Sequence, residues 1–251
     1  MALEALRLPA VIAHRGASLA HPENTLAAFE AGIGAGADMV ELDVRLTADG
    51  ELAVVHDPDV PAGLVHELTL DQLRGDGEPA TRVPTLRETL ELLRGRAAVE
   101  IEIKNYGSEP GYEPGGGPRI VEAVVGLVRE LRFPDALVAS FDPECVDRAR
   151  RLAPEIATGQ LVEGIVDLAA ALDGAAERGH AFLLPDVRLV EQAGPEFVAH
   201  AHERGVRLGV WTLNEPEPIE RLFAWGVDAV ESDDPAMAVR VRDAMGRAGA
   251  R

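Results

Sequence analysis

Short apolar runs alternate with longer amphipathic stretches along most of the chain. The apolar runs predict strands at Ala10–His14, Met39–Val44, Ala98–Lys104, Leu137–Ser140, Thr158–Val162, Ala181–Leu184, Arg207–Thr212 and Asp228–Ser232. Helical periodicity between them is clearest at Thr25–Ala35, Leu86–Arg94, Ile120–Leu131, Pro143–Leu152 and Pro216–Ala224. Strands that alternate with helices indicate parallel pairing through right-handed crossovers. Eight such units in 251 residues favour an α/β fold of the TIM-type (β/α)₈ barrel class, with a doubly wound open sheet as the alternative.

One further strand does not fit the count of eight. Residues 51–56 follow the second strand across an Asp49-Gly50 turn, and Asp-Gly between apolar runs is a strong signal for a β-hairpin. With a two-residue loop, counting back along the ladder places Asp43 opposite His56, and directly opposed residues point to the same face. The hairpin is therefore predicted to bring His56 beside the acidic residues of the preceding strand. A bulge would shift this register by one residue.

Two irregular segments follow predicted strands. Residues 57–84 are rich in proline and glycine and are interpreted as a small insertion, with one short helix near Thr69–Arg74. Residues 105–119 form the second segment. In a barrel both would lie at the C-terminal face, where active sites are found. We interpret residues 1–251 as a single barrel domain.

The composition excludes several classes of protein. Acidic residues number 43 and basic residues 24, so the formal charge of −19 argues against nucleic-acid binding and stable association with anionic membranes. The single cysteine, Cys145, excludes an internal disulfide, and 47% hydrophobic residues exclude disorder. No apolar run approaches the ~20 residues that span a bilayer, and residues 1–9 lack an apolar signal core. We expect a soluble, cytoplasmic protein, and its oligomeric state stays open.

Two of the predicted strands carry acidic residues in strict alternation with apolar ones. Glu41 and Asp43 share one face of their strand, and Glu100, Glu102 and Lys104 share one face of theirs. In a barrel the apolar face suits the helix layer, so these charged side chains should point inward. Several carboxylates in a core are costly unless a cation neutralises them. Carboxylate ligands suit Mg²⁺, Ca²⁺ or Mn²⁺ rather than Zn²⁺. The alternative is a polar core whose carboxylates pair with Lys104 or with an arginine, Arg15.

Two histidines are candidates for acid–base chemistry. His14 ends the first predicted strand and is followed by Arg15 and Gly16, and the glycine lets the backbone approach a ligand. His14 alone would more often be a hydrogen-bonded core histidine than a catalyst. Together with His56 and the inward carboxylates it favours catalysis, because imidazoles titrate near neutral pH.

An ordered set of motifs runs from about Val11 to Pro235. The motifs are His14-Arg15-Gly16, Pro22-Glu23-Asn24-Thr25, Glu41-Leu42-Asp43-Val44, Asp49-Gly50, His56-Asp57, Glu102-Ile103-Lys104, Ser140-Phe141, Trp211-Thr212 and Ser232-Asp233-x-Pro235. No single motif is specific, but the set together resembles the glycerophosphodiester phosphodiesterase family. The resemblance implies a TIM-type barrel that hydrolyses glycerophosphodiesters to glycerol 3-phosphate and an alcohol.

The resemblance also implies roles for eight residues of this sequence. These roles are acid–base catalysis by His14 and His56, divalent-ion binding, usually of Ca²⁺ or Mg²⁺, by Glu41, Asp43 and Glu102, phosphate contact by Arg15 and Lys104, and packing on the glycerol by Trp211. The implied substrate is a small glycerophosphodiester. Which histidine is the acid, and whether water or the neighbouring glycerol hydroxyl attacks the phosphorus, stays open.

Two positions depart from the family's usual pattern. Residues 58–63 stand where a longer glycine-containing stretch is common, which leaves the leaving alcohol open. Glu231 stands at a position that is usually uncharged, and it either adds a carboxylate at the barrel mouth or forms an ion pair.

Three other functions are weighed against hydrolysis of glycerophosphodiesters. An aldolase or isomerase would need a Schiff-base or enolate-stabilising lysine in an apolar pocket, and the glutamate neighbours of the only lysine, Lys104, should keep it charged. A non-catalytic barrel that binds a phosphate ligand would not need both histidines. A lysophospholipase D-like phosphodiesterase acting at membranes would need an exposed apolar or basic rim. The insertion lacks aromatic residues and the chain is acidic, which disfavours that function.

Overall fold

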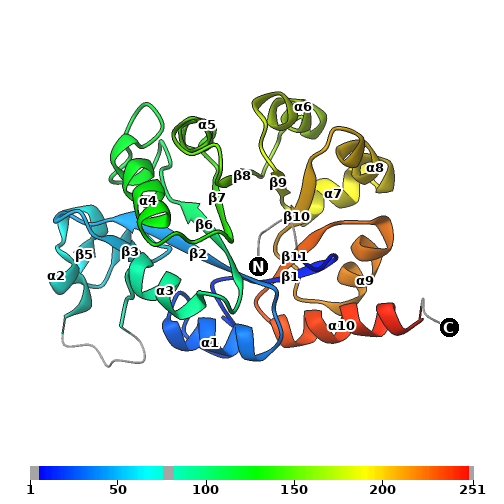
Figure 1. Ribbon diagram of the computed structural model, residues 1–251, viewed down its shortest axis with the longest axis horizontal. Coiled ribbons are helices and arrows are strands. Elements are labelled where there is room, and N and C mark those ends of the chain that lie inside the picture. Colours follow the sequence, from blue (N-terminus) through cyan, green and yellow to red (C-terminus); the bar gives the residue numbers. More distant parts are fainter. Residues whose placement is uncertain (1–5, 76–81, 249–251) are drawn as a thin grey trace.

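A closed barrel of eight parallel strands forms the centre of the computed structural model, which describes residues 6–75 and 82–248 (Figure 1). The barrel strands are β1 (Ala10–Ala13), β2 (Met39–Leu46), β6 (Ala98–Ile103), β7 (Ala136–Ser140), β8 (Ala157–Val162), β9 (Phe182–Pro185), β10 (Arg207–Val210) and β11 (Ala229–Ser232). The barrel closes because β1 pairs with β11 on one side and with β2 on the other. The predicted (β/α)₈ barrel is confirmed, and each predicted strand is present within two residues of its expected bounds.

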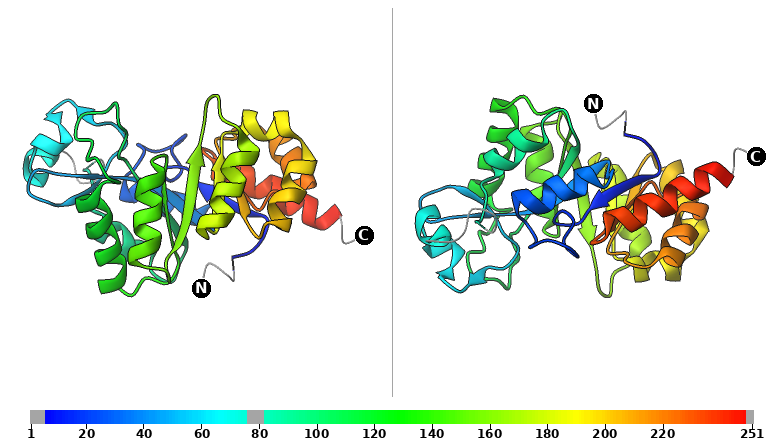
Figure 2. Two further views of the ribbon diagram at one scale, coloured as in Figure 1. Left: turned by 90° about the horizontal axis from the view of Figure 1, so that it is seen from above. Right: turned by 90° about the horizontal axis from the view of Figure 1, so that it is seen from below.

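Helices surround the ring of strands, as Figures 1 and 2 show. They are α1 (Leu26–Gly34), α3 (Leu86–Leu93), α4 (Pro118–Glu130), α5 (Pro143–Leu152), α6 (Leu168–Arg178), α7 (Val187–Ala193), α8 (Pro195–Glu203), α9 (Pro216–Trp225) and α10 (Pro235–Ala248), while the short α2 (Leu70–Arg74) lies to one side of the barrel. Side-chain caps fix several of their starts; for example, the Thr25 hydroxyl accepts from the Ala28 amide and satisfies a free helix N–H. No helix in residues 6–75 and 82–248 is long and apolar enough to cross a membrane.

The alternation of β2 and β6 sorts side chains as predicted. Val40, Leu42 and Val44 are completely buried in a cluster that includes Phe29 of α1 and Leu90 of α3. Each such side chain stabilises the fold by about 1.5–3 kcal/mol. The charged residues of the same strands therefore point into the barrel.

The predicted hairpin is present, but its predicted register is wrong by one residue. Strand β3 (Leu52–Val54) pairs antiparallel with β2 through Val44↔Val54. The Val55 amide donates to the Asp43 carbonyl at 3.0 Å, so Val55 rather than His56 lies opposite Asp43. The loop has three residues instead of two and ends at Gly50, whose φ of +87° is a conformation that glycine adopts readily.

The region predicted as an insertion extends to one side of the barrel (Figure 1). It contains a small hairpin of β4 (Asp59–Val60) and β5 (Gly63–Leu64), a 3₁₀ turn η2 (Val65–Glu67) and α2. Thr69 caps α2 in a reciprocal capping box with Gln72, which confirms the short helix expected there. Residues 76–81 of the predicted insertion lie outside the described residues.

Candidate active site

An acidic cluster lies inside the barrel on the neighbouring strands β2 and β6. The register pairs Asp43 with Glu102 and Glu41 with Glu100. Asp43 is 0% exposed, Glu41 2% and Glu102 7%. One carboxylate oxygen from each of these three residues lies within 4.8 Å of the other two. The structure thus brings together the three carboxylates that the sequence analysis assigned to a divalent ion.

Two basic residues offset part of this negative charge. Lys104 Nζ lies 2.9 Å from Asp43 Oδ1 and 2.6 Å from Glu102 Oε1. Arg15 Nε lies 3.2 Å from Asp43 Oδ2. Asn24 donates to the same Asp43 carboxylate at 2.7 Å. Asp43 is therefore the best compensated member of the cluster.

The pKa values of the cluster separate accordingly. Burial alone would raise the pKa of Asp43, but attraction from Lys104 and Arg15 outweighs burial and holds that pKa at about 2. Burial raises the pKa of Glu102 to about 7, even though Lys104 opposes the shift. Burial alone would lower the pKa of Lys104, but its two carboxylates keep it above the usual value. A neutral, nucleophilic lysine of the aldolase type does not fit this environment.

The acidic charge exceeds what these two cations can balance. Glu100 and Glu231, 1% and 2% exposed, belong to the same interior, so five buried carboxylates face Arg15 and Lys104. Within the described residues, Glu41 Oε1, Glu231 Oε1 and both oxygens of Glu100 have no hydrogen-bond partner. Burial, reinforced by neighbouring carboxylates, raises the pKa of Glu41, Glu100 and Glu231 well above the usual value. Buried oxygens without partners are the donors that a divalent cation requires, so the cluster fits one.

His14 is fixed at the mouth of the barrel by a carboxylate that the sequence analysis did not assign. Its Nδ1 lies 2.6 Å from Asp233 Oδ1. Asp233 also accepts from Ser18 Oγ at 3.0 Å and from Asn214 Nδ2 at 2.6 Å. Burial opposes ionisation of Asp233, but the hydrogen bond from His14 helps to hold its pKa at about 2. An ionised Asp233 keeps the proton of His14 on Nδ1, so Nε2 is the nitrogen available to the site.

His56 has a similar arrangement on the hairpin arm. Its Nδ1 lies 2.7 Å from Asp57 Oδ1, and the buried Arg45 donates from Nε to the His56 carbonyl at 2.7 Å. Burial, followed by repulsion from Lys104, lowers the pKa of His56. The chain leaves the ladder after Val55, so His56 lines the same cavity as His14 despite the shifted register.

One cavity of about 280 Å³ joins these groups. Its lining includes His14, Arg15, Glu41, His56, Glu100, Glu102, Lys104, Tyr106, Phe141, Leu161, Glu163, Trp211 and Glu231. Of the eight residues named from the sequence, Asp43 is absent from this lining because Lys104 and Arg15 cover it. Tyr106, Phe141 and Trp211 form an aromatic wall, with ring centroids 5.3 Å and 5.4 Å apart in succession.

Nearly the whole chain is similar to proteins of one known family. The model of the glycerophosphoryl diester phosphodiesterase family matches residues 14–237. The chain belongs to this family. A glycerophosphodiester phosphodiesterase of Caldanaerobacter subterraneus subsp. tengcongensis is 33% identical over 249 residues, which cover 92% of this chain and 96% of the relative.

Solved structures agree with this family assignment. A structure from Silicibacter pomeroyi DSS-3 superposes with a TM-score of 0.85 at 30% identity and covers 97% of each chain. A phosphodiesterase of Oleispira antarctica, solved in complex with the product sn-glycerol-3-phosphate, superposes with a TM-score of 0.83 at 27% identity and covers 97% of this chain and all of its own.

Proposed function

We propose that this protein hydrolyses glycerophosphodiesters to sn-glycerol 3-phosphate and an alcohol. The observation that carries the proposal is the convergence of two carboxylate-oriented imidazoles, His14 and His56, on one cavity with an acidic cluster. Membership of the phosphodiesterase family supports the reaction. The relative that holds sn-glycerol-3-phosphate supports the product.

The proposed cation ligands are Glu41, Asp43 and Glu102. Their oxygens suit Ca²⁺ or Mg²⁺, and Mn²⁺ is also compatible. When bound, the ion would offset negative charge on the phosphoryl group. Glu41 Oε1, which has no hydrogen-bond partner among the described residues, supports this assignment, because a closed network of ion pairs would have left no such atom.

The side chains of this protein bind and orient the phosphate and move protons around it. Arg15 and Lys104 line the cavity and present cationic groups to the non-bridging oxygens. One histidine takes the proton of the attacking hydroxyl and the other gives a proton to the departing alkoxide, each worth roughly 10²–10⁴-fold in rate. Asp233 holds His14 so that Nε2 performs this transfer.

The aromatic wall supports a place for the glycerol. Trp211 donates from Nε1 to the Leu184 carbonyl at 2.8 Å, which fixes its ring at the cavity. Phe141 packs against it edge-on at an interplanar angle of 87°. We assign the carbon skeleton of the glycerol to the face of Trp211.

The test is a hydrolysis panel on the full-length chain. Glycerophosphocholine, glycerophosphoethanolamine, glycerophosphoglycerol and bis(p-nitrophenyl) phosphate are each supplied with Mg²⁺, Ca²⁺ or Mn²⁺, and released sn-glycerol 3-phosphate is measured. We expect release from the glycerophosphodiesters that stops with chelator and returns with the ion. Hydrolysis of the nitrophenyl ester alone, with no glycerol 3-phosphate from any natural diester, would refute the proposed substrate class.

A lysophospholipase D-like activity is the second candidate, and one observation favours it. Ile165 is 107% exposed and Leu19 71%, and both follow barrel strands at the C-terminal face that holds the cavity. Such apolar tips could contact an acyl chain. Lysophosphatidylcholine in the same panel separates the two functions, since a faster rate on it than on glycerophosphocholine would favour the lipid substrate.

A further inference from the structure

Glu231 is a buried carboxylate that the proposed hydrolysis does not use. It lies on β11 opposite Ile12 of β1, while its neighbour Val230 packs outward among the helices. Glu231 is 2% exposed, and its Oε1 has no hydrogen-bond partner in the described part of the chain. An ionised carboxylate held in this way is costly unless a cation meets it. A structural ion pair does not explain the residue, because no described arginine or lysine lies within salt-bridge distance of it.

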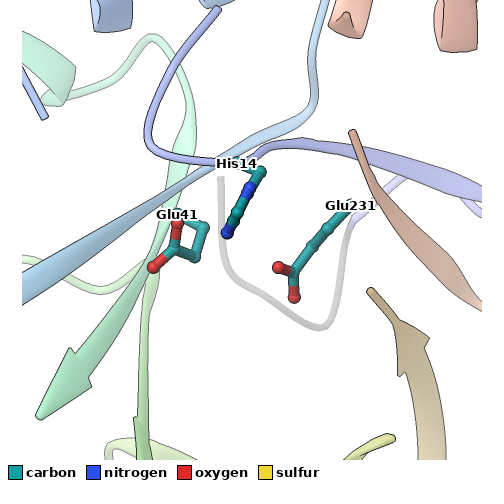
Figure 3. Close-up of side chains that lie close together, drawn as sticks. All are labelled: His14, Glu41 and Glu231. Atoms are coloured by element: carbon teal, nitrogen blue, oxygen red, sulfur yellow. The ribbon is translucent and has the colours of Figure 1, made fainter. Parts of the chain in front are cut away.

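Two other side chains point at the same place. His14, Glu41 and Glu231 each offer one ligand atom, and these atoms all lie within 4.8 Å of one another. Figure 3 shows a ring nitrogen of His14 directed toward the space between the two carboxylates. Asp233 holds Nδ1 of this ring, so the nitrogen available to a ligand is Nε2. The cavity reaches all three residues, so an ion can enter from solvent.

This group of ligands differs in chemistry from the all-oxygen cluster on β2 and β6. It shares Glu41 with that cluster but replaces the other carboxylates by Glu231 and an imidazole. One nitrogen and two oxygens suit Zn²⁺, whereas Mg²⁺ and Ca²⁺ prefer oxygen alone. We propose that His14, Glu41 and Glu231 form a second metal position that takes Zn²⁺ and lies beside the Mg²⁺ or Ca²⁺ position.

The second position has a consequence for activity that rests on the proposed function. An ion bound to His14 Nε2 occupies the lone pair that the proton transfer needs. Zn²⁺ at this position therefore inhibits the enzyme, even though the Mg²⁺ or Ca²⁺ position supports turnover. Glu231 acts as the specificity-determining ligand, since the other two residues already belong to the proposed catalytic site.

Binding is tested without reference to activity. Zn²⁺ is titrated calorimetrically into the full-length, chelator-stripped chain, and bound zinc is counted. We expect the wild type to bind one more Zn²⁺ per chain than Glu231→Gln, or Glu231→Gln to bind the second ion at least about 100-fold more weakly. Glu163→Gln removes another carboxylate that lines the same cavity and serves as the matched control, with zinc binding like that of the wild type.

A spectroscopic arm tests whether Glu231 is a ligand of the second ion. Co²⁺ replaces Zn²⁺, and we expect visible d–d absorption in the wild type and in Glu163→Gln that is lost in Glu231→Gln. Circular dichroism verifies that each variant is folded, and Glu231→Ile is the second variant if glutamine does not fold. Equal zinc stoichiometry and affinity in the wild type and the Glu231 variant would overturn the proposal.

Inhibition separates this proposal from the proposed function. With Mg²⁺ supporting turnover, Zn²⁺ should inhibit the wild type at concentrations at least about 100-fold lower than those that inhibit Glu231→Gln. If the second ion binds as expected but does not inhibit, the zinc position stands and the acid–base role of His14 fails. If the wild type binds no second ion, the zinc position fails while the hydrolysis panel still tests the function.

Discussion

At the start of strand β2, two acidic residues make opposite kinds of contact. Asp38, directly before the strand, accepts from the Val11 amide at 2.9 Å and forms an ion pair with the buried Arg242. Glu41, three residues later, accepts from the Arg15 amide at 2.8 Å, but its other oxygen has no partner in the described residues. The carboxylate of Asp38 is thus held by partners within the protein, whereas that of Glu41 lines the cavity.

The difference shows how structural and functional charges can be told apart. A charge that stabilises the fold has its partners within the chain, because a buried group without them is costly. A cluster that keeps buried oxygens without partners gains stability when a bound ion or ligand contacts those oxygens. Removing a partner of Asp38 should therefore cost stability, while changes around Glu41 and the cavity should alter ligand binding and turnover.

The largest expected effect is a loss of turnover on replacing the histidines of the cavity. His14→Ala and His56→Ala should each lower kcat by at least about 10²-fold, because each removes one proton transfer. Steady-state release of sn-glycerol 3-phosphate measures the loss. The fold should survive, and unchanged circular dichroism would establish this. Full turnover in either variant would remove that histidine from the mechanism.

The next largest effect is a loss of stability on replacing Arg242, the ion-pair partner of Asp38. Among the described residues, Arg242→Met leaves the partly buried carboxylate of Asp38 with only the Val11 amide as a hydrogen-bond partner, and such a loss costs about 1–3 kcal/mol. For a chain of this size the melting temperature should fall by roughly 2–4 °C for each kcal/mol. Thermal unfolding monitored by circular dichroism tests this, with retained turnover below the transition. An unchanged melting temperature would show that water solvates the Asp38 carboxylate well enough to replace Arg242.

A smaller effect compares the two carboxylates that orient the histidines. Asp233→Asn should lower kcat about 10–100-fold, because the partly buried Asp233 fixes which nitrogen of His14 faces the cavity. Asp57→Asn should cost less than about 10-fold, since the Asp57 side chain is 68% exposed and water can replace it. Kinetics of the two variants side by side measure the contrast. Equal losses would contradict the greater role given to Asp233.

The smallest effect has the opposite sign from that at Arg242. Glu231→Ile removes a buried carboxylate oxygen that has no partner in the described part of the chain, so the metal-free protein should become more stable by about 1–2 kcal/mol. Chemical unfolding of chelator-stripped wild type and variant measures the change. A loss of stability would show that Glu231 holds the barrel together instead of serving a ligand.

The barrel and the position of its carboxylates were predictable from the sequence. Strict alternation in Val40–Val44 determines which side chains face the helices, and no distant residue alters that local geometry. The same logic placed Glu102 and Lys104 inside. These predictions rest on the period of a strand, which a single sequence contains.

Features set by distant contacts were not predictable in the same way. The hairpin register depends on whether the loop has two or three residues, and the Gly50 conformation that decides this is not visible in the sequence. Asp233 contacts His14 across 219 residues of chain, so only the closed barrel reveals the pair. Asn24, which bonds Asp43, is similarly hidden in the loop after β1.

The most direct test of the central claim is a calorimetric titration of Mg²⁺ and Ca²⁺ into the full-length, chelator-stripped chain. We predict that the wild type binds at least one of these ions and that Glu102→Gln binds it at least about 10-fold more weakly, since a direct ligand is lost. Absence of binding of either ion, in a protein that still hydrolyses glycerophosphodiesters, would contradict the account.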